Sequence, residues 1–316
     1  MENSDKTIVI EPENLKRYST GDNLSNNMGS GGANNAVSAP VIPAPGCIIG
    51  GKYRILSTLQ DGGASSVFIA HPLDNLSARY VIKIMQNTVR TSSSKRFLRE
   101  ARLHSNIIHD NIVKLIDYWS DDYGQYIVLE YIDGYSLKAC CSQFAFDEAA
   151  ALIVAFEVSK ALKYVWDNFN LVHRDIKPEN IMVDSSNYIK LLDFGISKSK
   201  NAAKETYLTM ENTILGTPGY MSPEQFINAK SAGIQSDMFS LGATLFYILT
   251  NVVPFSGSDL AEVYRNTCDT TPPAIQNYRS DISSRFISFL NRMMQRDAED
   301  RYNSWDEVLL EIQQMM

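Results

Sequence analysis

The sequence has few cysteines, and their placement excludes two kinds of small stabilised fold. Its 316 residues include four of them, Cys47, Cys140, Cys141 and Cys268. They show no CxxC spacing, and the adjacent pair is poorly suited to bond to itself. A disulfide framework or a zinc site is therefore not expected, and a reducing compartment such as the cytosol fits this cysteine usage.

An excess of positive charge and a long apolar run are also missing. The formal net charge is −7 and the pI is near 5.2, which argues against a general surface for nucleic acid or anionic membrane. Apolar runs such as residues 241–249 are shorter than the roughly 18 residues that a membrane span needs. The N-terminus lacks the charged and apolar regions of a secretion signal. We therefore expect a cytoplasmic protein with no nucleic-acid partner and no membrane span.

Apolar residues are scarce in the first 50 residues, which are rich in Asn, Ser, Gly and then Pro. Such a segment cannot offset the entropy lost on ordering, so residues 1–50 are predicted to be a disordered, low-complexity tail. Residues 6–10 form a small apolar patch within it. This patch has two interpretations: a chance feature, or a site for a phosphothreonine-binding module, since Ile10 lies three residues after Thr7.

The most informative stretch is residues 173–195. It reads HRDIKPEN, then a short strand pair closed by a turn at residues 184–187, then DFG. Asp175 and Asp193 lie on either side of this hairpin, with Lys177 and Asn180 at fixed offsets from the first, so four polar groups can converge on one phosphate. The stretch predicts a phosphoryl-transfer site. The alternative is that both motifs are loop sequences on a structural hairpin.

Each of these four residues has an expected role. In phosphoryl transfer the charge spreads over the phosphoryl oxygens, so protein groups act by positioning and neutralisation. Asp175 would accept the proton of the attacking hydroxyl or orient it, and Lys177 would screen the transferred phosphate. Asn180 and Asp193 would hold a divalent metal, because Mg²⁺ favours oxygen ligands and shares them with substrate phosphates.

With these motifs, the chain resembles a eukaryotic-type Ser/Thr protein kinase, in particular the bacterial members of that family, over residues 51–316. The resemblance implies an α+β, bilobal protein-kinase fold. Residues 51–132 would form a small lobe of antiparallel sheet with one main helix, and residues 133–316 a mostly helical large lobe. It also implies transfer of the γ-phosphate of ATP to Ser or Thr hydroxyls of proteins, with Mg²⁺ or Mn²⁺ as cofactor.

The small lobe is expected to begin with three strands joined by tight turns, at residues 53–60, 67–70 and 79–85. The first turn would cover the nucleotide phosphates, because glycine lets backbone N–H groups approach phosphate closely. Gly62 and Gly63 lie in this turn, and Val67 follows it. The family pattern G-x-G-x-x-G-x-V is incomplete, since Gln60 and Ser65 stand at two of its glycine positions. These two residues put the strength of ATP binding in question and not its occurrence.

Lys83 occupies the place of the family lysine that pairs with the α- and β-phosphates. An apolar strand that ends in lysine is common, so the assignment depends on a partner. Glu100, on the helical stretch at residues 94–104, is the expected partner, and its ion pair with Lys83 would mark the active arrangement of the small lobe.

The expected nucleotide pocket has apolar walls and a hinge. Val81, in the place where the family usually has alanine, and Met182 would contact the adenine together with Val67. The backbone of the hinge, with Glu130 and Ile132, would meet the adenine edge.

A polar segment with several hydroxyls follows the DFG motif and ends in GTPGYMSPE, as expected of a mobile switch. Thr209 and Thr213 are the candidate self-phosphorylation sites, and Arg174 is the expected receiver of the phosphate. The alternative is that these threonines only solvate the loop. Thr217 is expected to help seat the acceptor hydroxyl near Asp175.

Two charged residues are expected to hold the large lobe together. Asp237 lies on an apolar helix, where a charge is costly unless it is satisfied, and it would accept hydrogen bonds from the backbone of the HRD loop. Arg301 would form a buried pair with Glu224.

A helix is predicted at residues 147–166, with Asp147 as its N-cap, and the HRD loop would follow it.

Two other functions compete with an active protein kinase. A pseudokinase or scaffold that binds partners through the fold is supported by the incomplete glycine loop and Val81. It is opposed by the presence of Lys83, Glu100, Asp175, Asn180 and Asp193. A small-molecule kinase of related fold is opposed by GTPGYMSPE and Arg301, because these residues would form a surface on which peptide substrates dock.

Overall fold

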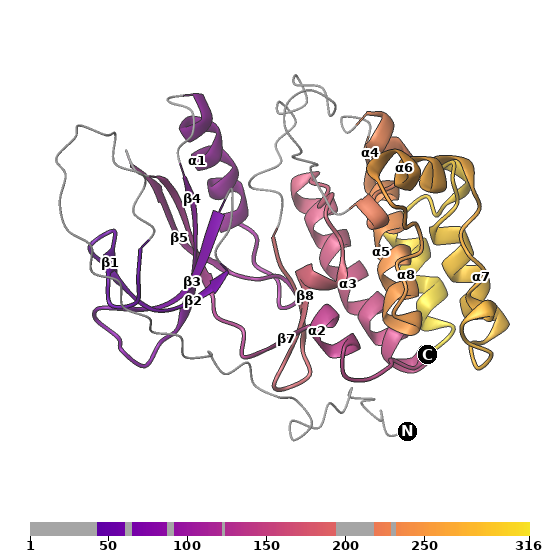
Figure 1. The fold of residues 1–316 in the computed structure, drawn as a ribbon, viewed down its shortest axis with the longest axis horizontal. Coiled ribbons are helices and arrows are strands. Elements are labelled where there is room, and N and C mark those ends of the chain that lie inside the picture. The colour runs from indigo at the N-terminus through magenta and orange to yellow at the C-terminus, as the bar shows by residue number, and fades with distance from the viewer. Residues whose placement is uncertain (1–42, 61–64, 87–91, 122–123, 194–217, 229–231) are drawn as a thin grey trace.

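The computed structural model describes the chain in six ranges, residues 43–60, 65–86, 92–121, 124–193, 218–228 and 232–316. Inside these ranges, the side chains of residues 86, 92–96 and 100 are outside the description. The described chain forms a small lobe of strands with one long helix and a large, mostly helical lobe beside it (Figure 1). The predicted α+β, two-lobed architecture is confirmed.

Six strands form the antiparallel sheet of the small lobe, in the order β1-β2-β3-β4-β6-β5. The strands are β1 (Ile48–Ile49), β2 (Tyr53–Gln60), β3 (Ser65–Pro72), β4 (Tyr80–Gln86), β5 (Leu115–Ser120) and β6 (Gly124–Glu130). Successive side chains of a strand point to opposite faces. Ile82 and Val128 therefore join one apolar cluster, while Val81 and Leu129 join another that includes Phe97 of the long helix.

Strand β1 lies in a stretch that the sequence assigns to the tail. Ile48 pairs with Arg54 and Ile49 with Tyr53, so the folded chain begins before residue 51. Two apolar residues next to a glycine pair are too short to show a strand period. Pairing with β2, which is not visible in a local pattern, makes them a strand.

The long helix of the small lobe is α1 (Ser92–Ser105), which packs against β5 and β6. The segment after it is bonded to the large lobe. The Val113 amide donates to the Leu191 carbonyl at 2.9 Å, and the Leu191 amide donates to the Asn111 carbonyl at 2.8 Å. The Asn111 side chain donates to the Ile189 carbonyl at 2.9 Å. These bonds fix the base of the small lobe on the hairpin that precedes Asp193.

A second, three-stranded antiparallel sheet, in the order β7-β8-β9, lies where the lobes meet. Its strands are β7 (Gly134–Ser136), β8 (Ile181–Asp184) and β9 (Ile189–Leu191). The large lobe contains the helices α2 (Leu137–Cys141), α3 (Glu148–Phe169), α4 (Pro223–Ile227), α5 (Ile234–Thr250), α6 (Leu260–Asp269), α7 (Ser284–Met293) and α8 (Trp305–Gln313). Its short 3₁₀ turns are η2 (Pro178–Asn180), η4 (Pro218–Tyr220), η5 (Ile275–Asn277) and η6 (Ala298–Asp300). No helix in the described ranges combines the length and apolar content needed to cross a membrane.

Helices α3 and α5 form the centre of the large lobe. As predicted, Asp147 caps α3, and its carboxylate accepts the Ala150 amide at 2.8 Å. Asn170 ends α3 in a left-handed conformation, with φ of 51°. Almost every residue of α5 is buried. Burial on nearly every side places α5 in the interior of the lobe, where its Asp237 contacts the loop that follows α3.

Candidate active site

The HRD loop, residues 173–175, follows α3 and is held in place by hydrogen bonds to α5. Asp237 of α5 is 2% exposed, and its two carboxylate oxygens accept the backbone amides of His173 and Arg174, each at 2.7 Å. This confirms the predicted anchor. Arg174 has φ of 66°, a left-handed conformation that is unfavourable for a side chain of its size. Burial raises the pKa of the Asp237 carboxyl to about 7, while the two backbone donors act in the opposite direction.

Helix α4 holds the same loop from the other side. The Gln225 side chain donates to the Arg174 carbonyl at 3.2 Å, and Gln225 itself is held by Ser222 at the start of α4. The sequence does not reveal this contact, because it joins residues 51 positions apart without a charge or motif to indicate it.

His173 links the HRD loop to the strand end before Asp193. Its Nδ1 accepts the Asp175 amide at 3.3 Å, which leaves Nε2 to carry the proton and donate to the Leu192 carbonyl at 2.7 Å. The backbone bond from the Leu192 amide to the Asn180 carbonyl, 2.8 Å long, closes the same corner. The two motifs of the sequence thus meet through His173 and Asn180.

Asp175, Lys177 and Asn180 form one polar cluster. The Asn180 amide nitrogen donates to both the carbonyl and the carboxylate of Asp175, at 2.8 Å and 2.9 Å. The Lys177 ammonium lies 3.4 Å from the same carboxylate. The Asp175 side chain is therefore oriented on two sides, and a positive charge lies next to it.

Lys83 and Asp193 form the second part of the site. The Lys83 ammonium lies 3.2 Å from each carboxylate oxygen of Asp193, so the ion pair joins the small-lobe sheet to the large lobe. Asp193 has φ of 52°, the second left-handed non-glycine residue of the site. Glu100 lies on α1, but its side chain is outside the described residues, so its pairing with Lys83 stays a prediction.

The predicted walls of the nucleotide pocket lie near each other. Val81 and Met182 pack on the apolar cluster that contains Leu129 and Ile132. Val67 is half-buried and faces Lys83 across the β3–β4 pair. These residues bring an apolar surface to the lysine that is expected to meet phosphate.

Glu130 makes a contact that the sequence does not reveal. Its carboxylate accepts the Lys114 amide at 2.9 Å and pairs with the Lys190 ammonium, also at 2.9 Å. Its side chain thus joins the end of β6 to β9. The predicted contact of its backbone with adenine involves other atoms of the residue and stays a prediction.

Several predicted site residues are outside the described residues. They are Gly62, Gly63, Thr217, Thr209 and Thr213. Their roles stay predictions.

The residues that would hold a metal suit a hard cation. The described residues contain no group of three His, Cys, Asp or Glu side chains arranged to bind a metal by themselves. Asn180 donates through its nitrogen, so its amide oxygen would be the metal ligand, and the Asp193 side chain is 41% exposed. One amide oxygen and one carboxylate fit Mg²⁺, which takes its other ligands from phosphates and water.

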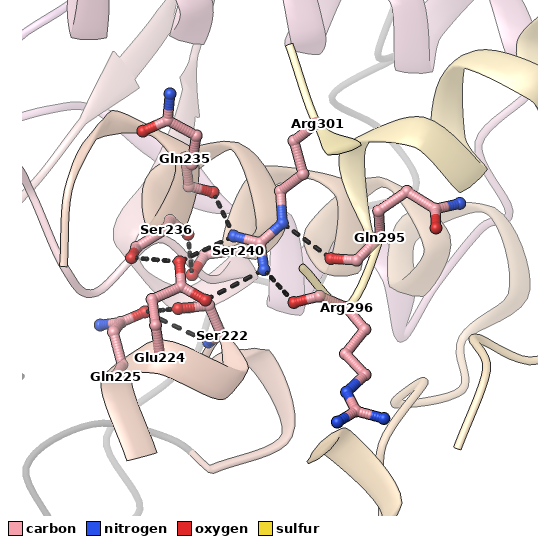
Figure 2. A network of polar contacts seen from close by, with 9 residues as sticks. All are labelled: Ser222, Glu224, Gln225, Gln235, Ser236, Ser240, Gln295, Arg296 and Arg301. Atoms are coloured by element: carbon pink, nitrogen blue, oxygen red, sulfur yellow. Dashed lines mark hydrogen bonds and ion pairs between the residues drawn. The ribbon is translucent and has the colours of Figure 1, made fainter. Parts of the chain in front are cut away.

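Arg301 and Glu224 form the predicted pair (Figure 2), in which the Arg301 side chain is fully buried and the Glu224 side chain is 20% exposed. The five N–H donors of the guanidinium make five hydrogen bonds: two to the Glu224 carboxylate, at 2.7 and 3.0 Å, and one each to the carbonyls of Gln235, Gln295 and Arg296. Burial alone would raise the pKa of the Glu224 carboxyl, but the bonds and charge of Arg301 outweigh it and lower the pKa. The pair fixes α4, and through Gln225 it supports the HRD loop.

Comparison with known proteins gives one consistent result. Residues 53–312 match the model of a protein kinase domain. The chain is 31% identical to the probable serine/threonine-protein kinase PknB of Lactococcus lactis, over 84% of this chain and 42% of the relative. It is 30% identical to the serine/threonine-protein kinase PrkC of Bacillus subtilis, over 84% of this chain and 40% of that protein. The chain therefore spans about two fifths of the length of these relatives.

Solved structures agree on the fold. The kinase domain of Mycobacterium tuberculosis PknI superposes with a TM-score of 0.67 at 20% identity, over 87% of this chain and all of that one. Rad53 bound to AMP-PNP superposes with a TM-score of 0.66 at 24% identity, over 82% of this chain and 64% of that one. At these identities the likeness bears on the fold alone, and it confirms the predicted kinase fold.

Proposed function

The chain belongs to the protein kinase family, and on this premise we propose that it is a Ser/Thr protein kinase that transfers the γ-phosphate of ATP to hydroxyls of proteins. One observation carries the proposal. Asp175 contacts Asn180 and Lys177, and Lys83 pairs with Asp193. The backbone bond from Leu192, which precedes Asp193, to Asn180 links the two groups. The left-handed backbone of Arg174 and Asp193 and the burial of Asp237 each cost folding free energy. Such strain is concentrated at functional sites.

In this proposal, Asp175 orients the acceptor hydroxyl and takes its proton as the oxygen attacks the γ-phosphorus. The new O–P bond forms while the bond to the β-phosphate oxygen breaks, and ADP leaves with that electron pair. Lys177, 3.4 Å from Asp175, neutralises charge on the transferred oxygens. Thr217 would help to seat the acceptor.

The remaining site residues would bind the nucleotide. Lys83 would contact the α- and β-phosphates, with Glu100 as its partner on α1, while the backbone of Gly62 and Gly63 covers them. The adenine would contact Val67, Val81 and Met182 and the backbone of Glu130 and Ile132. Asn180 and Asp193 would hold Mg²⁺ or Mn²⁺, whose charge would stabilise the β- and γ-phosphate oxygens.

Self-phosphorylation at Thr209 or Thr213 is the proposed means of regulation. Arg174 is the proposed receiver of the phosphate. Its Nε is buried and has no hydrogen-bond partner among the described residues. A phosphate oxygen would satisfy that donor with a charge-assisted bond.

We further propose the domain division predicted above, a tail at residues 1–50, a small lobe at 51–132 and a large lobe at 133–316, with one change: β1, Ile48–Ile49, belongs to the small lobe and not to the tail. A cytoplasmic location is proposed on the same terms, from cysteine usage and charge.

A radiolabelled ATP assay with Mg²⁺ and a general protein acceptor tests the proposed activity. The intact chain should label the acceptor on Ser or Thr, and Asp175→Asn should lower kcat by about 10²–10⁴-fold. Lys83→Met should lower activity mainly through ATP binding. Lys163→Met, which changes a half-buried lysine of α3 that pairs with Asp167 and Asp306 outside the site, is the control and should leave activity unchanged.

Two results would refute the assignments. Activity that survives both Asp175→Asn and Lys83→Met would show that other residues perform the transfer. An intact chain that binds ATP and transfers nothing would favour the pseudokinase or scaffold, for which the incomplete glycine loop is the supporting observation.

A further inference from the structure

The outer face of α1 is exposed, and it carries both leucine and arginine. Phe97, Ala101 and His104 face the core of the small lobe and are at most 3% exposed. The opposite side shows Leu98, Arg99, Arg102 and Leu103, with the two leucines 36% and 40% exposed. Residues three and four apart on a helix are neighbours, so these four form one surface. We call it the α1 outer face.

This face is positively charged in an acidic protein. Its described charged residues are Arg99 and Arg102, whereas the net charge of the chain is −7. Within the described residues, no ion pair involves Arg99 or Arg102. The face therefore fits a partner that combines carboxylates with a few apolar side chains.

The first part of this chain has that composition. Residues 2–13 contain Glu2, Asp5, Glu11 and Glu13, with Lys6 as the one basic residue. Residues 8–10, Ile-Val-Ile, lie between the acidic pairs. We propose that residues 2–13 dock on the α1 outer face of the same chain, with Ile8, Val9 and Ile10 against the leucines and the glutamates against the arginines.

The length of the connecting segment allows this contact. About 30 residues lie between Glu13 and residue 43, where the described chain begins. A flexible segment of that length has an end-to-end distance of about 30 Å, which is comparable to the diameter of a small domain. Tethering also gives an effective concentration of about 1 mM. A contact with a Kd near 1 mM would therefore be occupied about half of the time. The Pro, Gly and Ser residues of the connecting segment would not prevent residues 2–13 from reaching α1.

The consequence for catalysis rests on the proposed function. Helix α1 carries Glu100, so a ligand on its outer face would act on the element that is expected to complete the Lys83 pair. The docking itself does not depend on activity. For that reason its test uses no phosphoryl transfer.

The test places the photo-crosslinker p-benzoylphenylalanine at position 9 of the full chain and maps the crosslinked peptides by mass spectrometry. The expected crosslinks join residue 9 to residues 98–103 of the same molecule. Arg99→Glu with Arg102→Glu should lower their yield about tenfold. Adding Glu11→Arg and Glu13→Arg to that variant should restore most of the yield, because the charges are then exchanged across the contact.

A matched control separates this effect from a change in net charge. Arg54→Glu with Arg265→Glu alters two exposed arginines of β2 and α6 by the same total charge and should leave the yield unchanged. Arg99→Gln with Arg102→Gln removes the charge without adding carboxylates near the end of α1, and should lower the yield if the Glu variant proves unstable.

Three results would overturn the proposal. One is a set of crosslinks spread over both lobes, and another is an equal loss of yield in the control variant. The third is crosslinks that join isotopically light and heavy chains in a mixture, which would assign the face to a second copy.

Discussion

At the scale of single residues, Arg301 shows how one buried charge supports the site. It is 1% exposed, and all five of its donors are bonded. Arg301→Met would leave the half-buried Glu224 carboxylate without its partner, and breaking a buried pair typically costs about 3–5 kcal/mol. We expect a loss of that size in the free energy of unfolding, measured by urea denaturation.

Arg285→Met is the comparison for this change. Arg285 pairs with Glu311 at 3.1 Å, but the two side chains are 47% and 33% exposed, and pairs open to solvent contribute at most about 1 kcal/mol. Similar losses in the two variants would contradict the distinction between a buried and an exposed ion pair.

Asp237 gives a prediction that depends on pH. Its pKa of about 7 in the folded protein lies above the ordinary carboxyl value near 4, so the folded protein binds this proton more tightly than the unfolded chain does. Stability from this group is therefore complete below about pH 4 and is lost as the pH rises through about 7. Asp237→Asn removes the titration. We expect the stability advantage of the wild type over this variant to shrink by about 1–3 kcal/mol between pH 5 and pH 8.

Denaturation curves of both proteins across this range measure the difference directly. Because the comparison is between two proteins at each pH, other carboxyls such as Asp281, whose pKa is lowered to about 2 by its bond with Arg279, cancel. An advantage that grows with pH would mean that the two backbone donors, and not burial, dominate the environment of Asp237.

These residues also show what a sequence reveals about single positions. Asp237 could be predicted because a charge within an apolar helix must be satisfied, and Arg301 because its segment resembles the family pattern. The ion pair of Glu130 with Lys190 and the bond from Gln225 to Arg174 could not. Glutamate, lysine and glutamine at these places look like ordinary surface residues until the fold brings distant segments together.

At the scale of elements, the turn between β1 and β2 tests whether β1 is part of the fold. Gly50 has φ of 57°, and a Cβ there would lie 2.7 Å from the Trp119 ring. Gly51 has a similar φ of 67°, but no atom lies within 4 Å of its Cβ position. Gly50→Ala should therefore cost more than Gly51→Ala, which carries only the backbone strain of about 1–2 kcal/mol. Urea denaturation of the two variants measures the difference, and equal losses would contradict the contact of this turn with Trp119.

The same elements mark the limit of pattern reading. Helix α3 was predictable because it has an N-cap and apolar residues at helical spacing over many turns. β1 was not, because two residues carry no period and its stability comes from pairing with β2. The residues at 53–60 had enough length to show their strand without such help.

At the scale of the whole molecule, the lobes are joined by a few polar links around the candidate site. The pair of Lys83 with Asp193, the pair of Glu130 with Lys190 and the bonds from residues 111–113 to β9 all cross the junction. Apolar contacts cross the junction as well, since Met182 and Leu192 pack against the small-lobe cluster that contains Phe97, and Ile112 belongs to the large core. A ligand that contacts both sides of this junction should therefore stabilise the molecule as a unit.

This expectation gives a test of nucleotide binding that needs no catalysis. A ligand present at 100 times its Kd adds about 2.7 kcal/mol to the free energy of unfolding, or about 5–10 °C in Tm for a domain of this size. We expect a non-hydrolysable ATP analogue with Mg²⁺ to raise Tm by that amount. Lys83→Met should remove most of the shift, because Lys83 is the cation expected to contact the phosphates.

Lys52→Met is the matched control, since Lys52 pairs with Asp117 at 2.8 Å and is largely exposed. Its shift in Tm should equal that of the wild type. A full shift in Lys83→Met would mean that the nucleotide binds elsewhere, and no shift in the wild type at millimolar analogue would mean that the departures at Gln60 and Ser65 prevent binding.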